Sequence, residues 1–237
     1  EGRVMFENIR KIILYLMCDA FSEIIIILGG IILGLPLPMT AIQILWINLV
    51  SDGFPNMALT IDPKRADLMK EKPRFSGERL INTWMSALIG FVSLVAGLIT
   101  LASFIIVYKL TNDLVTARSV AFITLGINSL VYVFSVRTLM TPFWKNHVFE
   151  NTWLVFAVLA GLVLQVLPFT SSSLRQFFGL SSLGPMYWLG AIGLSVFMFF
   201  MIEVFKFVYH LKVSRNHDGK NGVFSTKNHS PPSILDK

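Results

Sequence analysis

Charged residues and cysteine are both scarce in this sequence of 237 residues. Asp, Glu, Lys and Arg make up 14% of the chain, whereas soluble domains carry about 25%. The single cysteine, Cys18, excludes a disulfide and a cysteine-based metal site within the chain. Hydrophobic residues instead make up 54%, among them 20 phenylalanines. A soluble fold of this size could not bury so much apolar surface, so the composition indicates an integral membrane protein.

Six apolar stretches approach the length of about 20 residues that a helix needs to cross a bilayer. They run over residues 12–35, 41–61, 84–108, 114–136, 152–168 and 186–207. The pattern predicts an all-α membrane protein, a bundle of six transmembrane helices embedded in the lipid bilayer. We expect residues 1–11 to form the end of a cytoplasmic stalk, residues 12–210 the transmembrane domain, and the polar residues 211–237 a disordered tail.

Basic residues lie mostly on one side of this expected bundle. The segments 1–11, 61–83, 137–151 and 206–237 hold 17 of the 20 Lys and Arg residues. Because loops rich in Lys and Arg face the cytoplasm, we expect both termini to be cytoplasmic. The net charge of +6 is therefore explained by topology, and we expect no nucleic-acid partner.

Polar side chains within the spans are few, and their spacing places several on shared helix faces. Asp19 and Glu23 lie four residues apart in the first span. Asn48, Ser51 and Asp52 follow the i, i+3, i+4 pattern in the second span. Charged groups inside a membrane are costly and usually functional. These residues are therefore the candidates for a buried polar site.

The carboxylates of Glu23 and Asp52 are predicted to lie at one depth. The first two spans form a hairpin about Leu37, which lies 14 residues after Glu23 and 15 residues before Asp52. At about 1.5 Å per residue, both carboxylates lie roughly 21–22 Å from the turn, inside a hydrocarbon core about 30 Å thick. Two acidic groups at one depth need a cation or protons to be tolerated. With Asn48 and Ser51 they supply oxygen ligands, which a hard cation such as Ca²⁺ prefers.

The second span also contains a helix-breaking residue next to these candidates. Pro55 follows Asp52 and Gly53 closely and cannot donate a backbone hydrogen bond. Interrupted helices line ion sites in transporters because the freed carbonyl groups face the ion. We therefore expect a local interruption of the helix here.

The remaining polar residues of the spans are interpreted as structural. Asn128 and Gln165 are expected to join helices by hydrogen bonds. Glu203, which has Lys206 three residues later, is interpreted as part of a local ion pair or as an interfacial residue.

The second span and its neighbours resemble a known family. The run PMTAIQILWINLVSDGFP, residues 38–55, closely resembles the sixth transmembrane helix of type II P-type ATPases, the calcium pumps and their relatives. The segments EGR and NIRK, together with Tyr15, resemble the stalk that leads into the fifth helix, and Glu23 falls at that helix's ion-binding glutamate. Residues 67–74 resemble the loop between the sixth and seventh helices. The bundle is thus similar to the fifth to tenth helices of such a pump.

This resemblance implies a set of cation ligands. Glu23, Asn48 and Asp52 match ligand positions of the family, and Ser51 takes the place of a threonine found in calcium pumps. The implied cation is Ca²⁺, bound as the transported substrate. Na⁺, K⁺ or Mn²⁺ stay open as alternatives, as does proton transport through Asp19, Glu23 and Asp52.

Two departures from the family pattern favour one cation site over two. Ala20 stands where the family usually has asparagine, with the acidic Asp19 beside it. In the fourth span no carboxylate matches the glutamate that completes a second calcium site in some pumps, although Asn128 lies close to that position. Asp19 and Asn128 are therefore predicted to be accessory polar residues.

The resemblance also implies what the sequence lacks. The phosphorylated aspartate motif, the actuator and nucleotide-binding domains, and the first four membrane helices of such pumps are absent from it. The chain begins without an initiator methionine, and we expect it to be a piece of a longer ATP-driven pump of the plasma membrane. Its partner would be the N-terminal half, where ATP and Mg²⁺ would act. A non-catalytic, standalone membrane protein is the remaining alternative.

Overall fold

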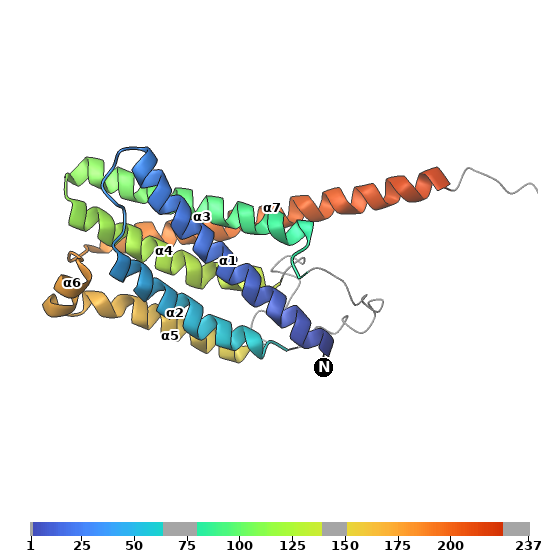
Figure 1. The fold of residues 1–237 in the computed structure, drawn as a ribbon, viewed down its shortest axis with the longest axis horizontal. Coiled ribbons are helices and arrows are strands. Elements are labelled where there is room, and N and C mark those ends of the chain that lie inside the picture. Colours follow the sequence, from blue (N-terminus) through green and yellow to red (C-terminus); the bar gives the residue numbers. More distant parts are fainter. Residues whose placement is uncertain (1, 64–79, 139–150, 225–237) are drawn as a thin grey trace, which may run out of the picture.

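The structure, a computed structural model, describes residues 2–63, 80–138 and 151–224, and within these ranges it contains helices and no strand. The side chains of residue 52 and of residues 210–224 lie outside this description. The helices are α1 (Gly2–Ile32), α2 (Ala41–Thr60), α3 (Thr83–Thr111), α4 (Leu114–Arg137), α5 (Thr152–Val166), η4 (Leu167–Phe169), α6 (Ser172–Phe178) and α7 (Pro185–Phe224). Figure 1 shows the long helices lying alongside one another as a bundle. The predicted all-α class is confirmed.

Five helical segments among the described residues are long and apolar enough to cross a membrane. They are α1, α3, α4, α5 together with η4, and α7 over Pro185–Tyr209. The sixth expected span, α2, has 20 residues but does not reach the same hydropathy. Its polar residues, among them Asn48 and Ser51, lower the mean hydropathy of the helix. A helix corresponds to each of the six expected spans, five of them meet this length-and-hydropathy criterion, and the exception is the helix predicted to hold most of the ligands.

Helix α4 lies at the centre of the bundle. In its most apolar window 89% of the residues are buried, against 28–50% in the other four spans. It contacts α1, α2, α3, α5 and α7. The polar residues of α4 therefore face neighbouring helices, where they are available to join those helices or to serve a buried site.

Small residues let these helices approach one another closely. A Cβ atom at Gly97 of α3 would lie only 2.6 Å from Cγ2 of Ile25 in α1. A Cβ atom at Gly126 of α4 would overlap the side-chain amide of Gln165 in α5. Lipid tails are as apolar as the side chains they replace, so helix association in a membrane depends on such close packing.

Polar side chains define where three of the helices begin. Asn82, Asp113 and Asn151 each accept a backbone hydrogen bond in the first turn of α3, α4 and α5, respectively. These caps satisfy N–H groups that a helix leaves open at its start. The hydroxyl of Thr116 also donates to Asp113 and thereby holds the pKa of that carboxyl below its usual value.

The C-terminal segment differs from the sequence-based expectation. Residues 211–237 were expected to form a disordered tail, but α7 continues without a break to Phe224. No proline occurs between residues 211 and 224, and extending an existing helix costs far less than starting one. Residues 225–237 lie outside the described residues. Residues 2–11, within the expected stalk end, are the first turns of α1.

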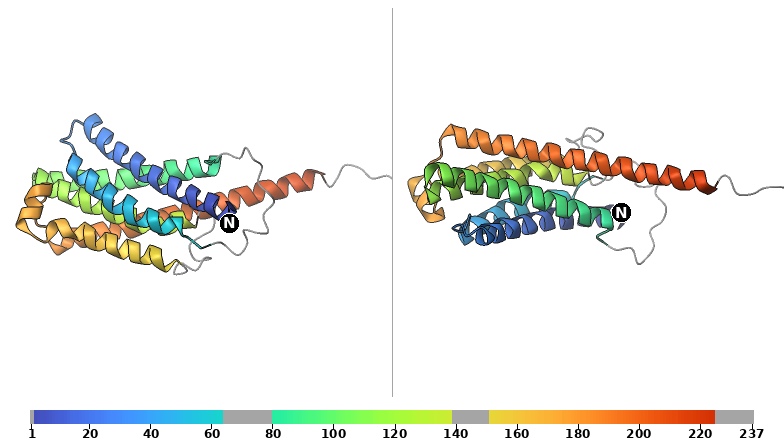
Figure 2. Two further views of the ribbon diagram at one scale, coloured as in Figure 1. Left: turned by 60° about the horizontal axis from the view of Figure 1, so that its bottom comes forward. Right: turned by 90° about the horizontal axis from the view of Figure 1, so that it is seen from above.

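The two ends of the bundle contain different elements. The first residues of α1 and the last residues of α7 lie at one end, which we call the inner end (Figures 1 and 2). Helix α6, the α1–α2 turn and the α3–α4 turn lie at the opposite, outer end. This is the arrangement that an even number of membrane crossings would produce.

Candidate cation site

Two of the predicted ligands meet between α1 and α2. The amide Nδ2 of Asn48 donates a hydrogen bond to Oε2 of Glu23 at 3.4 Å. Both side chains are half-buried. The distance is at the long end of the range for such bonds, so the carboxylate and the carboxamide are adjacent without being tightly bound to each other.

The other two predicted ligands follow Asn48 along α2. Ser51 is 1% exposed, and its hydroxyl donates to the backbone carbonyl of Ile47 at 2.8 Å. The side chain of Asp52 lies outside the described part of the structure, so its predicted meeting with Glu23 at one depth stays a prediction. Its backbone belongs to α2, one helical turn after Asn48.

Helix α2 is continuous through Pro55, so the expected interruption is wrong. A proline inside a helix still removes one donor, because its nitrogen carries no hydrogen. The carbonyl of Ser51 therefore receives no helical hydrogen bond from residue 55. The helix keeps its geometry while one backbone oxygen next to the predicted ligands lacks its usual donor.

Asp19 lies one turn from Glu23 on α1 but bonds to a different helix. The hydroxyl of Ser129 in α4 donates to Oδ2 of Asp19 at 2.8 Å. Oγ of Ser129 and the hydroxyl of Tyr15 are 2.9 Å apart, and the hydroxyl of Tyr132 donates to the carbonyl of Tyr15 at 3.3 Å. Asp19 is 2% exposed. It thus belongs to a cluster of hydroxyl groups between α1 and α4.

Asn128 and Gln165 behave differently from each other. Nε2 of Gln165 donates to the carbonyl of Phe122 at 3.0 Å, which joins α5 to α4 as predicted. Asn128 is 1% exposed, and within the described chain neither atom of its amide has a hydrogen-bond partner. The expectation that Asn128 joins helices by hydrogen bonds is therefore wrong for this structure.

The expected pair of Glu203 and Lys206 is present and lies between α7 and α4. Nζ of Lys206 is 3.1 Å from Oε1 of Glu203, and it also donates to the carbonyl of Ser135 at 2.9 Å and to Oγ1 of Thr138 at 2.6 Å. Both charged side chains are buried, so the local ion pair is confirmed and the interfacial alternative is not.

A second buried ionic cluster, which the sequence did not indicate, lies at the inner end. Asp62, just after α2, accepts hydrogen bonds from Nζ of Lys11 in α1 and from Nε of Arg137 in α4, both at 2.7 Å. Nδ2 of Asn151, the cap of α5, donates to Asp62 at 2.8 Å, and Nδ2 of Asn8 donates to the Asp62 carbonyl at 3.0 Å. We call these five residues the Asp62 cluster.

The outer end of α2 is also attached to its neighbours. Nε2 of Gln43 donates to the carbonyl of Phe178 in α6 at 3.0 Å, and the ring of Trp46 lies edge-on to that of Phe178. In the preceding turn, the carbonyl of Leu37 accepts from Nε of Arg118 at 2.9 Å. Helix α2 is therefore held at both ends, with the Asn48–Glu23 contact between them.

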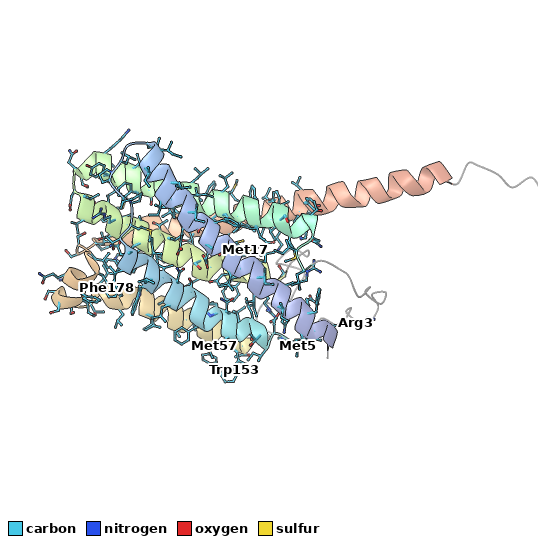
Figure 3. All side chains as sticks on the ribbon, in the orientation of Figure 1. Arg3, Met5, Met17, Met57, Trp153 and Phe178 are labelled. Atoms are coloured by element: carbon cyan, nitrogen blue, oxygen red, sulfur yellow. The ribbon has the colours of Figure 1, made fainter. Side chains whose placement is uncertain are left out.

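An apolar groove between α2 and α5 is separate from these polar residues. Its lining includes Phe54 and Met57 of α2 and Trp153 and Phe156 of α5. Figure 3 shows Met57 and Trp153 next to each other on this side of the bundle. Such a surface suits lipid chains or another helix and offers few ligands to an ion.

Oxygen atoms, rather than a cluster of acidic side chains, characterise the candidate site. Among the described residues, no group of three or more His, Cys, Asp or Glu side chains comes together. Glu23 supplies a carboxylate, Asn48 a carboxamide, and Ser51 a hydroxyl and a carbonyl that lacks its helical donor. A cation of the Ca²⁺ type takes about six to eight oxygens, so these residues supply part of such a shell.

Comparison with known proteins places these residues in a family. A family model described as "Cation transporting ATPase, C-terminus" matches residues 36–208. The chain is 38% identical to "Calcium-transporting ATPase" of Bacillus subtilis (strain 168) over 206 residues, covering 85% of the chain and 23% of that protein. It is 35% identical to "Calcium-transporting ATPase 1" of Bacillus cereus (strain ATCC 10987 / NRS 248) over 222 residues, covering 87% and 25%. It therefore spans about a quarter of the length of these curated relatives.

Proposed function

The chain belongs to the family of cation-transporting ATPase C-terminal domains, and from this premise we propose that it is the cation-binding membrane part of an ATP-driven calcium pump. It is a multi-pass membrane protein. The observation that carries the proposal is the contact of Asn48 with Glu23 at 3.4 Å, which brings ligands of two helices together inside the bundle. The names of the relatives, which are calcium-transporting ATPases, support Ca²⁺ as the transported ion.

The Asn48–Glu23 contact also suggests how the site responds to a cation. The positive end of the Asn48 amide, Nδ2, is directed at the Glu23 carboxylate. A bound Ca²⁺ would take over this role, and the amide would turn its oxygen toward the ion. Asp52 would add the second negative charge, and Ser51 would add a neutral oxygen. Because these side chains contact one another only weakly before the ion binds, binding the ion breaks few favourable contacts.

A single Ca²⁺ site fits the polar residues of the bundle better than two sites. Asp19, the other acidic residue of α1 within the span, is engaged by Ser129 of α4 at 2.8 Å. Asn128, close to the position where some pumps have a second-site glutamate, carries no charge. A second divalent cation would therefore lack the carboxylates that offset its loss of hydration.

In the full-length pump, we propose that the N-terminal half supplies the first four helices and the actuator, phosphorylation and nucleotide-binding domains, where ATP and Mg²⁺ act. Movement there would reach the site through α1, which runs as one helix of 31 residues from Gly2 past Glu23. The inner end of the bundle would face the cytoplasm, with both termini on that side of the plasma membrane. The distribution of Lys and Arg supports this orientation.

The proposal is tested by substituting the two charged ligands in the full-length protein. Glu23→Gln and Asp52→Asn are expected to raise the Ca²⁺ concentration for half-maximal phosphoenzyme formation from ATP by about tenfold or more, since a contact to a charged group contributes about 1.5–3 kcal/mol. Glu203→Gln makes the same carboxyl-to-amide change outside the site and is the matched control. Unchanged Ca²⁺ dependence in both site variants would show that the ligand assignment is wrong.

A second candidate function, proton-coupled cation transport, is favoured by the hydroxyl cluster around Asp19. Tyr15, Ser129 and Asp19 form a continuous chain of hydrogen-bonding groups that ends on a buried carboxylate. In this alternative, turnover follows pH at fixed Ca²⁺, and Asp19→Asn changes the number of protons moved per Ca²⁺ in sealed vesicles. A standalone membrane protein without catalysis would show neither Ca²⁺-dependent nor pH-dependent turnover.

A further inference from the structure

The Asp62 cluster connects the two ligand-bearing helices at their inner ends. Asp62 is 4% exposed and Lys11 is 3% exposed, so their ion pair of 2.7 Å is shielded from water. Nδ2 of Asn8, also on α1, donates to the backbone carbonyls of Thr60 at 3.1 Å and Asp62 at 3.0 Å. Pulling α1 away from the end of α2 would therefore break a buried ion pair and two hydrogen bonds, which is strongly unfavourable.

The same carboxylate attaches this junction to the rest of the bundle. Arg137 at the end of α4 holds Oδ1 of Asp62 at 2.7 Å, and Asn151 at the start of α5 donates to the same oxygen. Oδ2 accepts from Lys11. One oxygen of the carboxylate therefore faces α4 and α5, and the other faces α1.

The position of this junction relates it to the candidate site. Lys11 precedes Glu23 by 12 residues on α1, and Asp62 follows Asn48 by 14 residues at the end of α2. These separations correspond to about 18–21 Å along a helix. The junction and the Asn48–Glu23 contact are thus two polar links between the same pair of helices, at different depths. A shift of α1 along α2 at the junction changes the distance between the ligands.

We propose that Asp62 is a positioning residue that fixes the register between α1 and α2 through Lys11 and Asn8, and thereby sets the cation affinity of a site it does not touch. The inference rests on the proposed function. As long as the Lys11–Asp62 pair is intact, a movement of α1 carries α2 with it, so that Glu23 and Asn48 move together. Loss of the pair lets α1 slide along α2, which disperses the ligands and weakens Ca²⁺ binding.

The test compares Lys11 and Arg137, the two basic side chains that hold the Asp62 carboxylate at the same distance, 2.7 Å. In the full-length protein, Lys11→Met removes the ion pair between Asp62 and α1, together with the 4.0 Å contact of Lys11 with Glu7 on the same helix. Arg137→Met removes the link to α4 and leaves the α1–α2 junction in place. Lys11→Met is expected to raise the Ca²⁺ concentration for half-maximal phosphoenzyme formation about fivefold or more. Arg137→Met is expected to lower the thermal stability about as much as Lys11→Met does. It is expected to change the Ca²⁺ concentration for half-maximal phosphoenzyme formation by less than about twofold.

Further variants keep the test decisive if Lys11→Met does not fold. Asn8→Ala breaks the two hydrogen bonds from α1 to the end of α2 and the long one that Asn8 accepts from Lys11 at 3.5 Å. It keeps the Lys11–Asp62 ion pair, so it is expected to shift the Ca²⁺ dependence in the same direction by a smaller factor. Lys11→Arg keeps the ion pair and is expected to retain the original Ca²⁺ dependence. Equal shifts in Lys11→Met and Arg137→Met, or no shift in Lys11→Met and Asn8→Ala, would overturn the proposal.

Failure of this inference is distinguishable from failure of the proposed function. Glu23→Gln, measured in the same assay, reports on the cation site itself. If Glu23→Gln weakens the Ca²⁺ response and Lys11→Met does not, the site assignment stands and the role of Asp62 is refuted. If the original protein and Glu23→Gln respond alike, the proposed function is refuted and with it the premise of this inference.

Discussion

At the scale of single residues, some buried polar groups of the bundle are engaged by a neighbouring helix and others, Asn128 among them, are not. Ser129 donates to Asp19, and Gln165 donates to a carbonyl of α4. Asn128 is as deeply buried, yet within the described residues neither of its amide atoms has a hydrogen-bond partner. A buried, unsatisfied polar group costs about 1–3 kcal/mol. Its presence is explained if Asn128 serves a ligand rather than the fold.

Replacing Asn128 tests this explanation. We expect Asn128→Leu to raise the thermal stability of the full-length protein without Ca²⁺, by up to about 1–3 kcal/mol, because an apolar side chain of the same branched shape removes the unsatisfied amide. If Asn128 is an accessory ligand, the same variant also binds Ca²⁺ more weakly. Thermal unfolding in detergent micelles, with and without Ca²⁺, measures both effects.

The control for this substitution is Gln165→Leu. It removes an amide that does donate, to the carbonyl of Phe122 at 3.0 Å, so it should lower stability by about 0.5–1.5 kcal/mol. If Asn128→Leu lowers stability as much as Gln165→Leu does, the amide of Asn128 has a partner in the native protein and the explanation above is refuted.

At the scale of elements, hydrophobic length alone predicts the helices well. The expected spans over residues 84–108 and 114–136 correspond to α3 (Thr83–Thr111) and α4 (Leu114–Arg137). The hairpin expected about Leu37 also brings the helices of Glu23 and Asn48 side by side, and these two residues do meet. The Asp62 cluster could not be predicted, because Lys11 and Arg137 lie 51 and 75 residues away from Asp62 in the sequence. Their meeting depends on how the helices pack, which a hydropathy pattern does not encode.

The packing of α3 against α1 depends on the absence of a side chain at one position. We expect Gly97→Ala to lower the stability of the full-length protein by about 1–3 kcal/mol, the usual cost of inserting atoms into a packed interior. The new Cβ would lie 2.6 Å from Cγ2 of Ile25 and 3.2 Å from the backbone carbonyl oxygen of Ser22, and a backbone atom does not move aside easily. Thermal unfolding in detergent measures the loss.

Gly90, on the same helix, provides the matched control. A Cβ atom there has nothing within 4 Å among the described atoms. Gly90→Ala is therefore expected to be neutral or to stabilise the protein slightly, by up to about 1 kcal/mol, because alanine favours a helix over glycine. Equal stability of the two variants would mean that α1 and α3 are not in close contact at Gly97.

At the scale of the whole molecule, the composition of α2 argues against a membrane span, whereas its place in the bundle argues for one. By length and composition α2 is not among the five candidate spans. It is nevertheless attached at the outer end by Gln43 to α6 and at the inner end through Asp62 to α4. These attachments lie at opposite ends of the bundle (Figure 1). We therefore expect α2 to cross the membrane with its neighbours, with its polar groups tolerated because they face protein or an ion.

The accessibility of engineered cysteines from the two sides of the membrane tests whether α2 crosses it. In a full-length protein freed of its other cysteines, Cys18 included, we expect Leu37→Cys to react with a membrane-impermeant maleimide only from the outer side of sealed vesicles. Ile61→Cys should react only from the inner side. Both positions flank α2 and are exposed, at 47% and 57%. Leu80 precedes the apolar span α3 and Lys109 lies in its last turn, so Leu80→Cys and Lys109→Cys should label from opposite sides. If the α3 pair behaves so while Leu37→Cys and Ile61→Cys label from one side, α2 does not span the membrane, and Glu23 and Asn48 cannot lie on a path across it.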